Sequence, residues 1–273
     1  MKSKGENLED IARGIRKSTV EMVYNARSAH IGSALSATDI LTALYFHSMN
    51  IDEKNPQWED RDRFILSKGH ACSALYITLA ERGFFSKQEL MENYTKNGTS
   101  FTAHTNYYGI PGIEVATGSL GHGMPIGVGM AFNAKLENKK YRTFVLLSDG
   151  ECDEGSTWEA FLSAQQLKLD NLTAIIDYNK IQSYGRVSEV LELEPFADKL
   201  RAFNWEVKEV NGHSVKDLTE ALDAVPFKQD KPNCIIAHTV KGKGVSYMEN
   251  TIECHYLTPS KEQYLKAMEE LSK

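Results

Sequence analysis

The sequence lacks several features that would assign it to particular classes of protein. No apolar run reaches the roughly 18 residues that a membrane-spanning helix needs, and the polar opening segment 1–10 has the pattern of neither a signal peptide nor an anchor. Its four cysteines are widely spaced and form no CxxC pair, so no zinc or redox motif is indicated and reduced, buried thiols are predicted. We therefore expect a cytoplasmic protein without a membrane partner.

An excess of positive charge is also absent. Lysine and arginine number 31 against 37 aspartate and glutamate residues, which gives a formal net charge of -6, and the basic residues are scattered along the chain. Proteins that bind the phosphate backbone of nucleic acids carry a clustered basic surface. The sequence therefore predicts that nucleic acid is not a partner.

No internal repeat, low-complexity tract or Pro- or Ser-rich linker interrupts the 273 residues. The composition, with 41% hydrophobic and 25% charged residues, is that of an ordinary globular protein with one large core. We accordingly treat residues 1–273 as a single domain, with the polar stretch 182–195 as the only plausible break. The stretch 84–113 has little pattern and is long for a connection, which is typical of functional or mobile loops.

What the sequence does contain is an alternation of two hydrophobic patterns. Helical periodicity is found in residues 7–27, 38–46, 121–136, 158–167, 215–224 and 260–271. Ser36 or Thr38 is a plausible cap for the second of these helices. Strand-like runs occupy residues 64–66, 143–147, 173–177, 206–210 and 234–238. The alternation predicts an α/β fold, a mostly parallel sheet flanked by helices, with ligands at the carboxyl ends of the strands.

Polar residues follow two of the predicted strands. Ser148-Asp149-Gly150 comes directly after one strand, and Asp177-Tyr178-Asn179 closes the next. Because the carboxyl ends of neighbouring parallel strands lie side by side, Asp149 and Asn179 can present a carboxylate and an amide oxygen to one hard cation. Taken singly, each residue is better explained by an ordinary turn or loop cap. The pair at this separation favours a metal site.

Glycines beside these residues suit an anion that accompanies the metal. Gly150 allows the backbone to approach a diphosphate closely. The helix that begins near Gly155 offers unpaired N–H groups at its amino end, which attract anions. Together these features predict a site for a metal-bound diphosphate.

The same segment resembles the thiamine diphosphate motif shared by enzymes that use this cofactor. The matching parts are Ser148-Asp149-Gly150, Glu154-Gly155 and Asp177-Tyr178-Asn179-Lys180-Ile181. The usual motif begins Gly-Asp-Gly, and a serine replaces its first glycine here. By this resemblance, magnesium or calcium would be held by Asp149, Asn179 and the backbone carbonyl of Ile181. Gly150 would face the diphosphate and Glu154 would order the surrounding network.

Four further segments resemble transketolases specifically, and they extend the match over most of the chain in the family's order. They are Ala29-His30-Ile31-Gly32-Ser33, Leu66-Ser67-Lys68-Gly69-His70-Ala71, Ala116-Thr117-Gly118-Ser119-Leu120-Gly121-His122-Gly123 and Lys241-Gly242-Lys243-Gly244. The resemblance implies the diphosphate-binding domain of the thiamine diphosphate-binding fold, with thiamine diphosphate as the cofactor.

The resemblance also implies catalytic roles for four histidines. His30 would contact substrate and help proton transfer, and His70 would reach the cofactor diphosphate. His104 would line the substrate channel, and His255 would lie near cofactor and substrate. An imidazole suits this work because it donates or accepts a proton near neutral pH. The contexts of His104 and His255 depart from the family's usual glycine-containing ones, a lone histidine is more often a packing or surface residue, and His122 receives no catalytic role.

The cofactor contacts implied by the resemblance come from several segments. They are Ser33, His70, Gly118, Ser119, Leu120, Gly150, Glu154, Asn179, Lys241 and His255. The glycine-rich stretch 117–123 lets backbone groups meet a flat ring, although close helix packing explains it as well. Lys241 can neutralise phosphate charge, and a solvated lysine is an equally good interpretation.

Thiamine chemistry also needs a carboxylate against the cofactor's pyrimidine ring, and in transketolases that glutamate lies on a second domain. The sequence reaches Lys273 without a segment for such a domain. We therefore expect a partner, a C-terminal transketolase subunit that supplies the activating glutamate, in a heterotetramer with two copies of each chain. The assembled enzyme would pass a two-carbon ketol unit from a ketose phosphate to an aldose phosphate, and the chain alone would be inactive.

Other functions remain open. A split transketolase for a modified sugar, sulfonated or branched, is one, because the contexts of His104 and His255 are unusual. The thiamine-binding subunit of a 2-oxoacid dehydrogenase shares the metal motif and a division into two chains. A noncatalytic module derived from the same fold is a third. A nicotinamide-binding domain is disfavoured, since no GxGxxG follows an early strand and the spacing in 118–123 is wrong.

Overall fold

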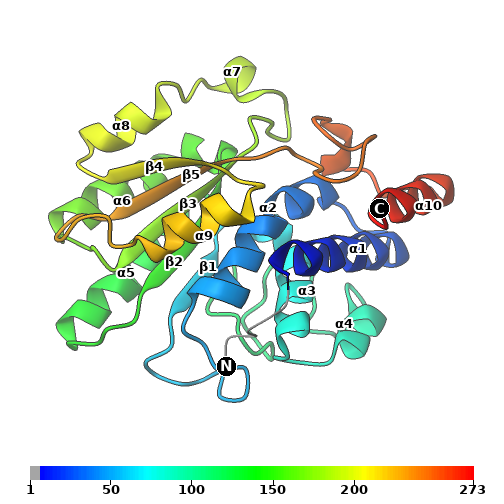
Figure 1. The fold of residues 1–273 in the computed structure, drawn as a ribbon, viewed down its shortest axis with the longest axis horizontal. Coiled ribbons are helices and arrows are strands. Elements are labelled where there is room, and N and C mark those ends of the chain that lie inside the picture. Colours follow the sequence, from blue (N-terminus) through cyan, green and yellow to red (C-terminus); the bar gives the residue numbers. More distant parts are fainter. Residues whose placement is uncertain (1–6) are drawn as a thin grey trace.

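Helices and strands alternate along the computed structural model, which describes residues 7–273 (Figure 1). Residues 1–6, part of the opening segment 1–10, lie outside the described residues. The strands are β1 (Arg63–Leu66), β2 (Thr143–Ser148), β3 (Leu172–Tyr178), β4 (Glu206–Asn211) and β5 (Asn233–His238). The helices are α1 (Leu8–Ala26), α2 (Ile31–Ala43), α3 (Cys72–Arg82), α4 (Lys87–Asn93), α5 (Gly123–Leu136), α6 (Gly155–Gln166), α7 (Val187–Val190), α8 (Phe196–Ala202), α9 (Val215–Asp223) and α10 (Lys261–Glu270).

The five strands form one parallel sheet in the order β1-β2-β3-β5-β4. Every residue of β2 and β3 is buried, which explains why these strands appear in the sequence as continuous apolar runs without alternation. The register places Ser148 opposite Asp177 and Tyr178 opposite His238, so the carboxyl ends of the three central strands coincide. The predicted parallel α/β fold is confirmed.

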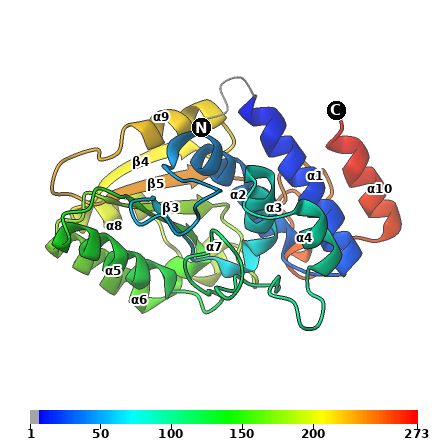
Figure 2. The same cartoon turned by 90° about the horizontal axis from the view of Figure 1, so that it is seen from below.

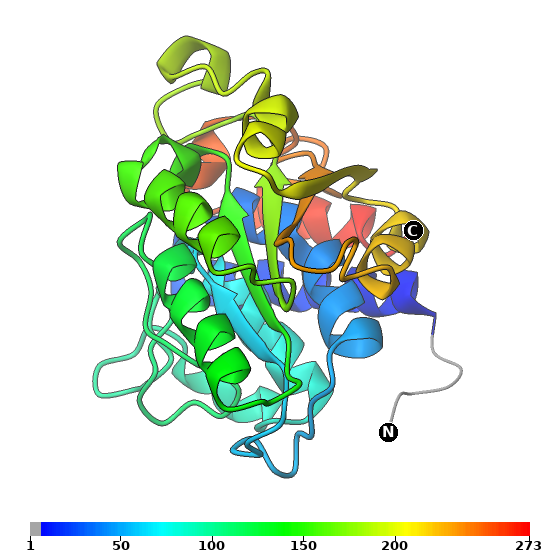
Figure 3. The same cartoon turned by 90° about the vertical axis from the view of Figure 1, so that its left-hand side faces the viewer.

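Helices cover both faces of the sheet (Figure 3). On one face α2, α3 and α9 pack apolar side chains such as Ile40, Leu75 and Leu218 against the sheet. On the other face α5 and α6 do the same with Val128 and Phe161. A third cluster joins α1 and α2 to α10, the last helix of the chain, which runs alongside α1 (Figure 2). The carboxyl ends of the strands are thereby left as the place where loops and helix ends converge.

The second helix differs from the sequence-based expectation. It was predicted over 38–46 with Ser36 or Thr38 as its cap, and it spans Ile31–Ala43 instead, with a π-helical turn after it. Ser36 and Thr38 are interior residues, and their hydroxyls donate to the Asp177 carboxylate and to the Ala34 carbonyl respectively, so they resemble caps in sequence only. The true N-cap is His30, which has a positive φ of 66° and no side-chain capping bond.

Four helices were not predicted. They are α3, α4, α7 and α8. Helix α4 lies inside the stretch 84–113, and α7 lies inside the polar stretch 182–195, so both supposed loops contain regular structure. All the residues of α3 from Cys72 to Ala80 are buried, and a helix that is apolar on every side has no periodicity to detect. Among residues 7–273 no helix is long and apolar enough to cross a membrane.

Candidate active site

One cavity of about 360 Å³ lies at the carboxyl ends of the strands. It is lined by ten of the residues singled out in the sequence, namely Ser33, His70, Leu120, Asp149, Gly150, Glu154, Asn179, Ile181, Lys241 and His255. These residues come from helix α2, from the segments that follow β1, β2, β3 and β5, and from two loops. The topology therefore gathers most of the predicted cofactor site into one place, as expected for an open parallel sheet.

Asp149 is the buried carboxylate of this cavity. Its side chain accepts hydrogen bonds from the backbone N–H groups of Gly150, at 2.7 Å, and Lys180, at 2.5 Å. Burial and, to a smaller extent, the negative charge of Asp177 raise the pKa of Asp149 to about 6. A carboxylate that two backbone donors hold in place, and whose charge is poorly compensated, is suited to meet a cation.

The oxygen atoms around Asp149 fit a hard divalent cation. Asn179 and Ile181 are both buried beside it, and they contribute an amide oxygen and a backbone carbonyl oxygen. No group of three or more His, Cys, Asp or Glu residues that could hold a metal occurs in the described part of the chain. Magnesium does not need such a cage, because phosphate oxygens and water complete its shell. The chemistry of these oxygens fits such a cation, and their role as metal ligands stays a prediction.

Lys241 occupies the far wall of the cavity and is almost completely buried. Its ammonium donates to the carbonyl oxygens of Ile181, at 2.9 Å, and Gln182, at 3.2 Å. A solvated surface lysine, one of the two interpretations of the sequence, is therefore wrong. A buried ammonium that faces a cavity beside Asp149 is placed to neutralise phosphate charge.

Four histidines stand together at one side of the cavity. The ring centroid of His30 is 5.6 Å from that of His70, 5.5 Å from that of His104 and 4.9 Å from that of His255. The backbone N–H of His30 donates to the carbonyl of His255 at 2.8 Å, which ties the start of α2 to a short turn near the chain's end. Residues 30, 70, 104 and 255 are thus brought into one cluster by the fold, although two of them stand in unusual sequence contexts.

Burial keeps these histidines neutral. Desolvation is the largest cause that lowers the pKa of all four side chains. The charge of Lys68 lowers the pKa of His70 further, and that of Lys241 helps to lower the pKa of His255 to about 3. A neutral imidazole carries one N–H donor and one acceptor nitrogen. The cluster can therefore hold hydroxyl and carbonyl groups from either side of a hydrogen bond.

Acidification is expected to weaken the fold through this cluster. A histidine whose pKa is lower in the folded than in the unfolded state contributes stability above its unfolded pKa, and this stability is lost as the pH falls. For His255 the loss takes place between pH 6.5 and about pH 3. His255→Asn should therefore lose less thermal stability than the wild type between about pH 7 and about pH 5, as followed by circular dichroism. His122→Asn, which changes an exposed histidine, is the control. Equal losses of thermal stability in the wild type and in His255→Asn would contradict the expectation.

The glycine-rich stretch 117–123 lies partly in the cavity. Leu120 lines it, Gly118 packs against the ring of His104, and Ser119 is exposed outside the lining. The backbone of Gly118 has a φ of 156°, and a Cβ there would come within 3.2 Å of His104. Glycine at this position thus permits the close approach of the stretch to the histidine cluster.

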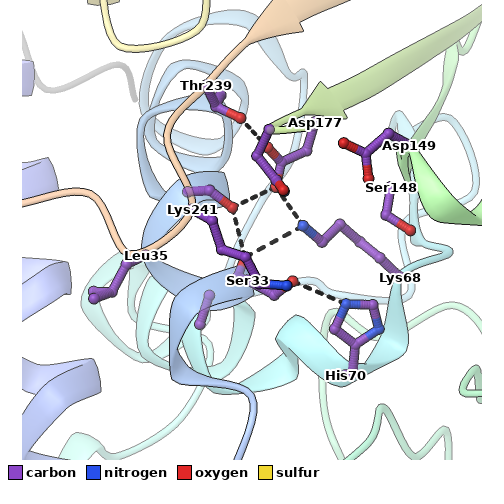
Figure 4. Close-up of polar contacts among 12 residues, drawn as sticks. Ser33, Leu35, Lys68, His70, Ser148, Asp149, Asp177, Thr239 and Lys241 are labelled. Carbon is purple, nitrogen blue, oxygen red and sulfur yellow. Dashed lines mark hydrogen bonds and ion pairs between the residues drawn. The ribbon is translucent and has the colours of Figure 1, made fainter. Parts of the chain in front are cut away.

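Two buried acidic residues near the site received no role in the sequence analysis. Glu151 is fully buried, accepts from the Ser67 hydroxyl and accepts from the Gly121 backbone at 2.9 Å, so it fixes the glycine-rich stretch. Asp177 pairs with Lys68, and both side chains are completely buried (Figure 4). The only sequence signal was that charged residues stood at the ends of apolar strands or just after them, where a buried sheet permits them only if they have partners.

The cavity at the ends of the parallel sheet thus brings together a buried carboxylate, a buried lysine and neutral histidines, which suit an anionic ligand with hydroxyl groups. The sequence matches the family described as transketolase, thiamine diphosphate binding domain, over residues 8–271. The chain belongs to the transketolase family, of which it is a thiamine diphosphate-binding domain.

Relatives of similar length are themselves subunits of larger enzymes. The chain is 45% identical to one of the subunits of the apulose-4-phosphate transketolase of Phocaeicola vulgatus, over 98% of this chain and 94% of that protein. It is 39% identical to SqwG, which is a subunit of the 6-deoxy-6-sulfo-D-fructose transketolase of a Clostridium species, over 98% of this chain and 97% of that protein. Both alignments therefore span nearly all of both sequences.

Solved transketolases share the fold but are longer. The enzyme of Leishmania mexicana superposes with a TM-score of 0.93 at 28% identity, over 98% of this chain and 42% of that one. The Campylobacter jejuni enzyme gives a TM-score of 0.91 at 32% identity, over 97% of this chain and 42% of that one. The chain thus spans less than half the length of these enzymes.

Proposed function

We propose that this chain is the N-terminal subunit of a two-subunit transketolase, which moves a two-carbon ketol unit from a ketose phosphate to an aldose phosphate. The observation that supports the proposal most directly is the cavity that joins Asp149, Asn179 and Lys241 to a cluster of neutral histidines. The relatives named as subunits, and the greater length of the solved enzymes, support a second polypeptide that supplies the activating glutamate. Membership of the transketolase family favours ketol transfer over oxoacid decarboxylation.

The chain's own residues divide between holding the cofactor and handling the sugar. Thiamine diphosphate, when bound, supplies the nucleophilic carbon and the electron sink that ketol transfer needs. Magnesium or calcium would be held by Asp149, Asn179 and the Ile181 carbonyl. The remaining cofactor contacts would come from Ser33, His70, Gly118, Ser119, Leu120, Gly150, Glu154, Lys241 and His255.

The sugar would meet the histidines. His30, which lies between His104 and His255, can donate to the substrate carbonyl or hydroxyls and pass a proton, because it is neutral and has neighbours on both sides. His104 and His255 would orient the hydroxyl groups. Such positioning raises the rate by fixing the reacting groups in a productive geometry.

The proposal predicts that activity depends on a second chain. The full chain, with thiamine diphosphate and magnesium, should show no ketol transfer from xylulose 5-phosphate to ribose 5-phosphate, and activity should appear on mixing with the candidate C-terminal subunit. The mixture should have the mass of two copies of each chain. Activity of the chain alone would contradict the division of the site, and a mixture inactive with every sugar tested would contradict the proposed reaction.

A second candidate is a split transketolase for a modified sugar. The names of the two relatives, one for apulose 4-phosphate and one for a sulfonated fructose, favour it. A panel of donors, with and without a sulfonate or a branched carbon chain, should be compared in the two-subunit assembly by kcat/KM. A preference for a modified donor over xylulose 5-phosphate would select this candidate, and the reverse order would select ordinary pentose phosphates.

A further inference from the structure

A buried ion pair behind the cavity wall has no role in the function proposed so far. The ammonium of Lys68 contacts the carboxylate of Asp177, and both side chains are completely buried. Lys68 also donates to the backbone carbonyl of Ser33 at 3.3 Å, and Figure 4 shows its ammonium between Asp177 and Ser33. A buried pair adds little net stability compared with apolar packing, because both charges lose their hydration. Stability alone therefore gives no reason for this pair.

The carboxylate of Asp177 is fully occupied. Besides Lys68, it accepts from the hydroxyl of Ser36, at 2.6 Å, and from the hydroxyl of Thr239. These partners belong to helix α2, to the segment after β1 and to the segment after β5, while Asp177 itself is in β3. One side chain thus joins four elements that border the cavity.

The neighbouring carboxylate, that of Asp149, has different contacts. Asp149 follows β2, the strand next to β3, and the side-chain contacts of its two oxygens are to backbone N–H groups. Two carboxylates that stand close together compete for any cation, and each disfavours the charge of the other. With Asp177 occupied by Lys68, Ser36 and Thr239, Asp149 is the carboxylate left to face a metal.

We propose that Lys68 is a positioning residue of the cofactor site: by binding Asp177 it reserves Asp149 for the metal, and by binding the Ser33 carbonyl it fixes the start of α2 against the strand ends. Ser33 in turn contacts Nε2 of His70 through its hydroxyl at 3.0 Å. Lys68 thus also orders Ser33 and His70, two of the proposed cofactor contacts. This inference rests on the proposed function, since it concerns the metal and cofactor of that site.

The charge of Lys68 also acts on the histidines. It is the second cause, after burial, that lowers the pKa of His70, and His255, His30 and His104 act in the same direction. Removing the ammonium should therefore raise the pKa of His70. A lysine that merely filled space would leave this titration unchanged, so it provides a readout separate from activity.

The deciding experiment is calorimetric titration of the full chain with thiamine diphosphate at saturating magnesium. The variant Lys68→Met/Asp177→Asn removes both charges, and it is expected to fold because no unpaired buried charge remains. We expect its affinity to fall by about tenfold or more, the effect of disturbing a coupled network. The single change Lys68→Met should weaken binding more, because Asp177 is then left buried and free to compete with Asp149.

A control variant and a second readout distinguish a positioning role of Lys68 from a purely structural one. Arg142→Met/Asp62→Asn removes another ion pair, at the amino ends of β1 and β2, and should bind with wild-type affinity. The nuclear magnetic resonance signal of His70 should titrate at higher pH in Lys68→Met than in the wild type. Wild-type affinity of Lys68→Met/Asp177→Asn for thiamine diphosphate would overturn the inference. Failure of the wild-type chain to bind would contradict the proposed function itself, and the inference with it.

Discussion

Asp149→Asn should reduce ketol transfer by the assembled enzyme about a thousandfold or more, because a bound metal contributes several kcal/mol to charge stabilisation. The substitution removes the only carboxylate in the predicted metal set, which also contains Asn179 and the Ile181 carbonyl. An amide carries no charge and cannot replace a carboxylate for a hard divalent cation. Activity should therefore fail through loss of the metal and, with it, of the diphosphate.

The fold should survive this change. The pKa of Asp149 rises from 3.8 to about 6 on folding, so its contribution to stability is present below 3.8 and is lost as the pH rises through about 6. At neutral pH the carboxylate thus opposes folding by about 3 kcal/mol. Asparagine relieves this cost but leaves one of the two backbone N–H groups without an acceptor, which costs about 1–3 kcal/mol. The two effects nearly cancel.

Thermal unfolding with and without magnesium and thiamine diphosphate separates these effects. The wild type should gain stability when both are added, because they bind the folded state only. Asp149→Asn should unfold near the wild-type temperature without ligands and show no gain with them. Asp170→Asn, a control near the start of β3, should behave as the wild type with the ligands. A wild-type gain by Asp149→Asn would contradict the assignment of the metal site.

His30→Asn should lower kcat/KM about a hundredfold, the scale of a proton-transfer contribution, with little change in cofactor affinity. Asparagine is preferred to alanine for this test. His30 has a φ of 66°, a left-handed conformation that strains most residues but that asparagine tolerates well. The start of α2 is then kept while the imidazole is lost.

Kinetics and cofactor titration on the same preparation distinguish the two roles open to His30. A loss in kcat with unchanged affinity for thiamine diphosphate supports contact with the substrate. A defect that saturating cofactor repairs would show that the histidine acts on the cofactor instead. His47→Asn serves as the matched control, because His47 is outside the cluster and pairs with Asp223 on the surface.

The fold was predictable from the sequence where burial is one-sided or where strands are continuous apolar runs. All five strands and the helices α1, α5, α6, α9 and α10 lie near their predicted positions. Helices α2 and α3 were misplaced or missed because a helix that is buried on every side loses its periodicity, whereas α4 and α7 are short helices that bury one residue each. Helix α2 is buried along its whole length, and its threonines satisfy their hydroxyls within the helix, so capping signals misplaced its start.

The site was predictable in part. Asp149 and Asn179 could be paired because parallel topology brings strand ends together, and the cavity contains both. The partnership of Lys68 with Asp177 could not be foreseen, since the two residues are 109 positions apart and nothing local couples them. The same holds for the four histidines, whose rings meet only through the packing of distant segments.

The two edges of the sheet limit how the molecule can associate. Strand β1 has only four residues, and strand β4 carries Glu206, Lys208 and Glu209 along its length. Short or charged edge strands are poor templates for the addition of a further strand. We therefore expect a second polypeptide to approach through helix surfaces and loops, and the continuous hydrogen-bonded sheets that lead to fibrous aggregation are disfavoured at both edges.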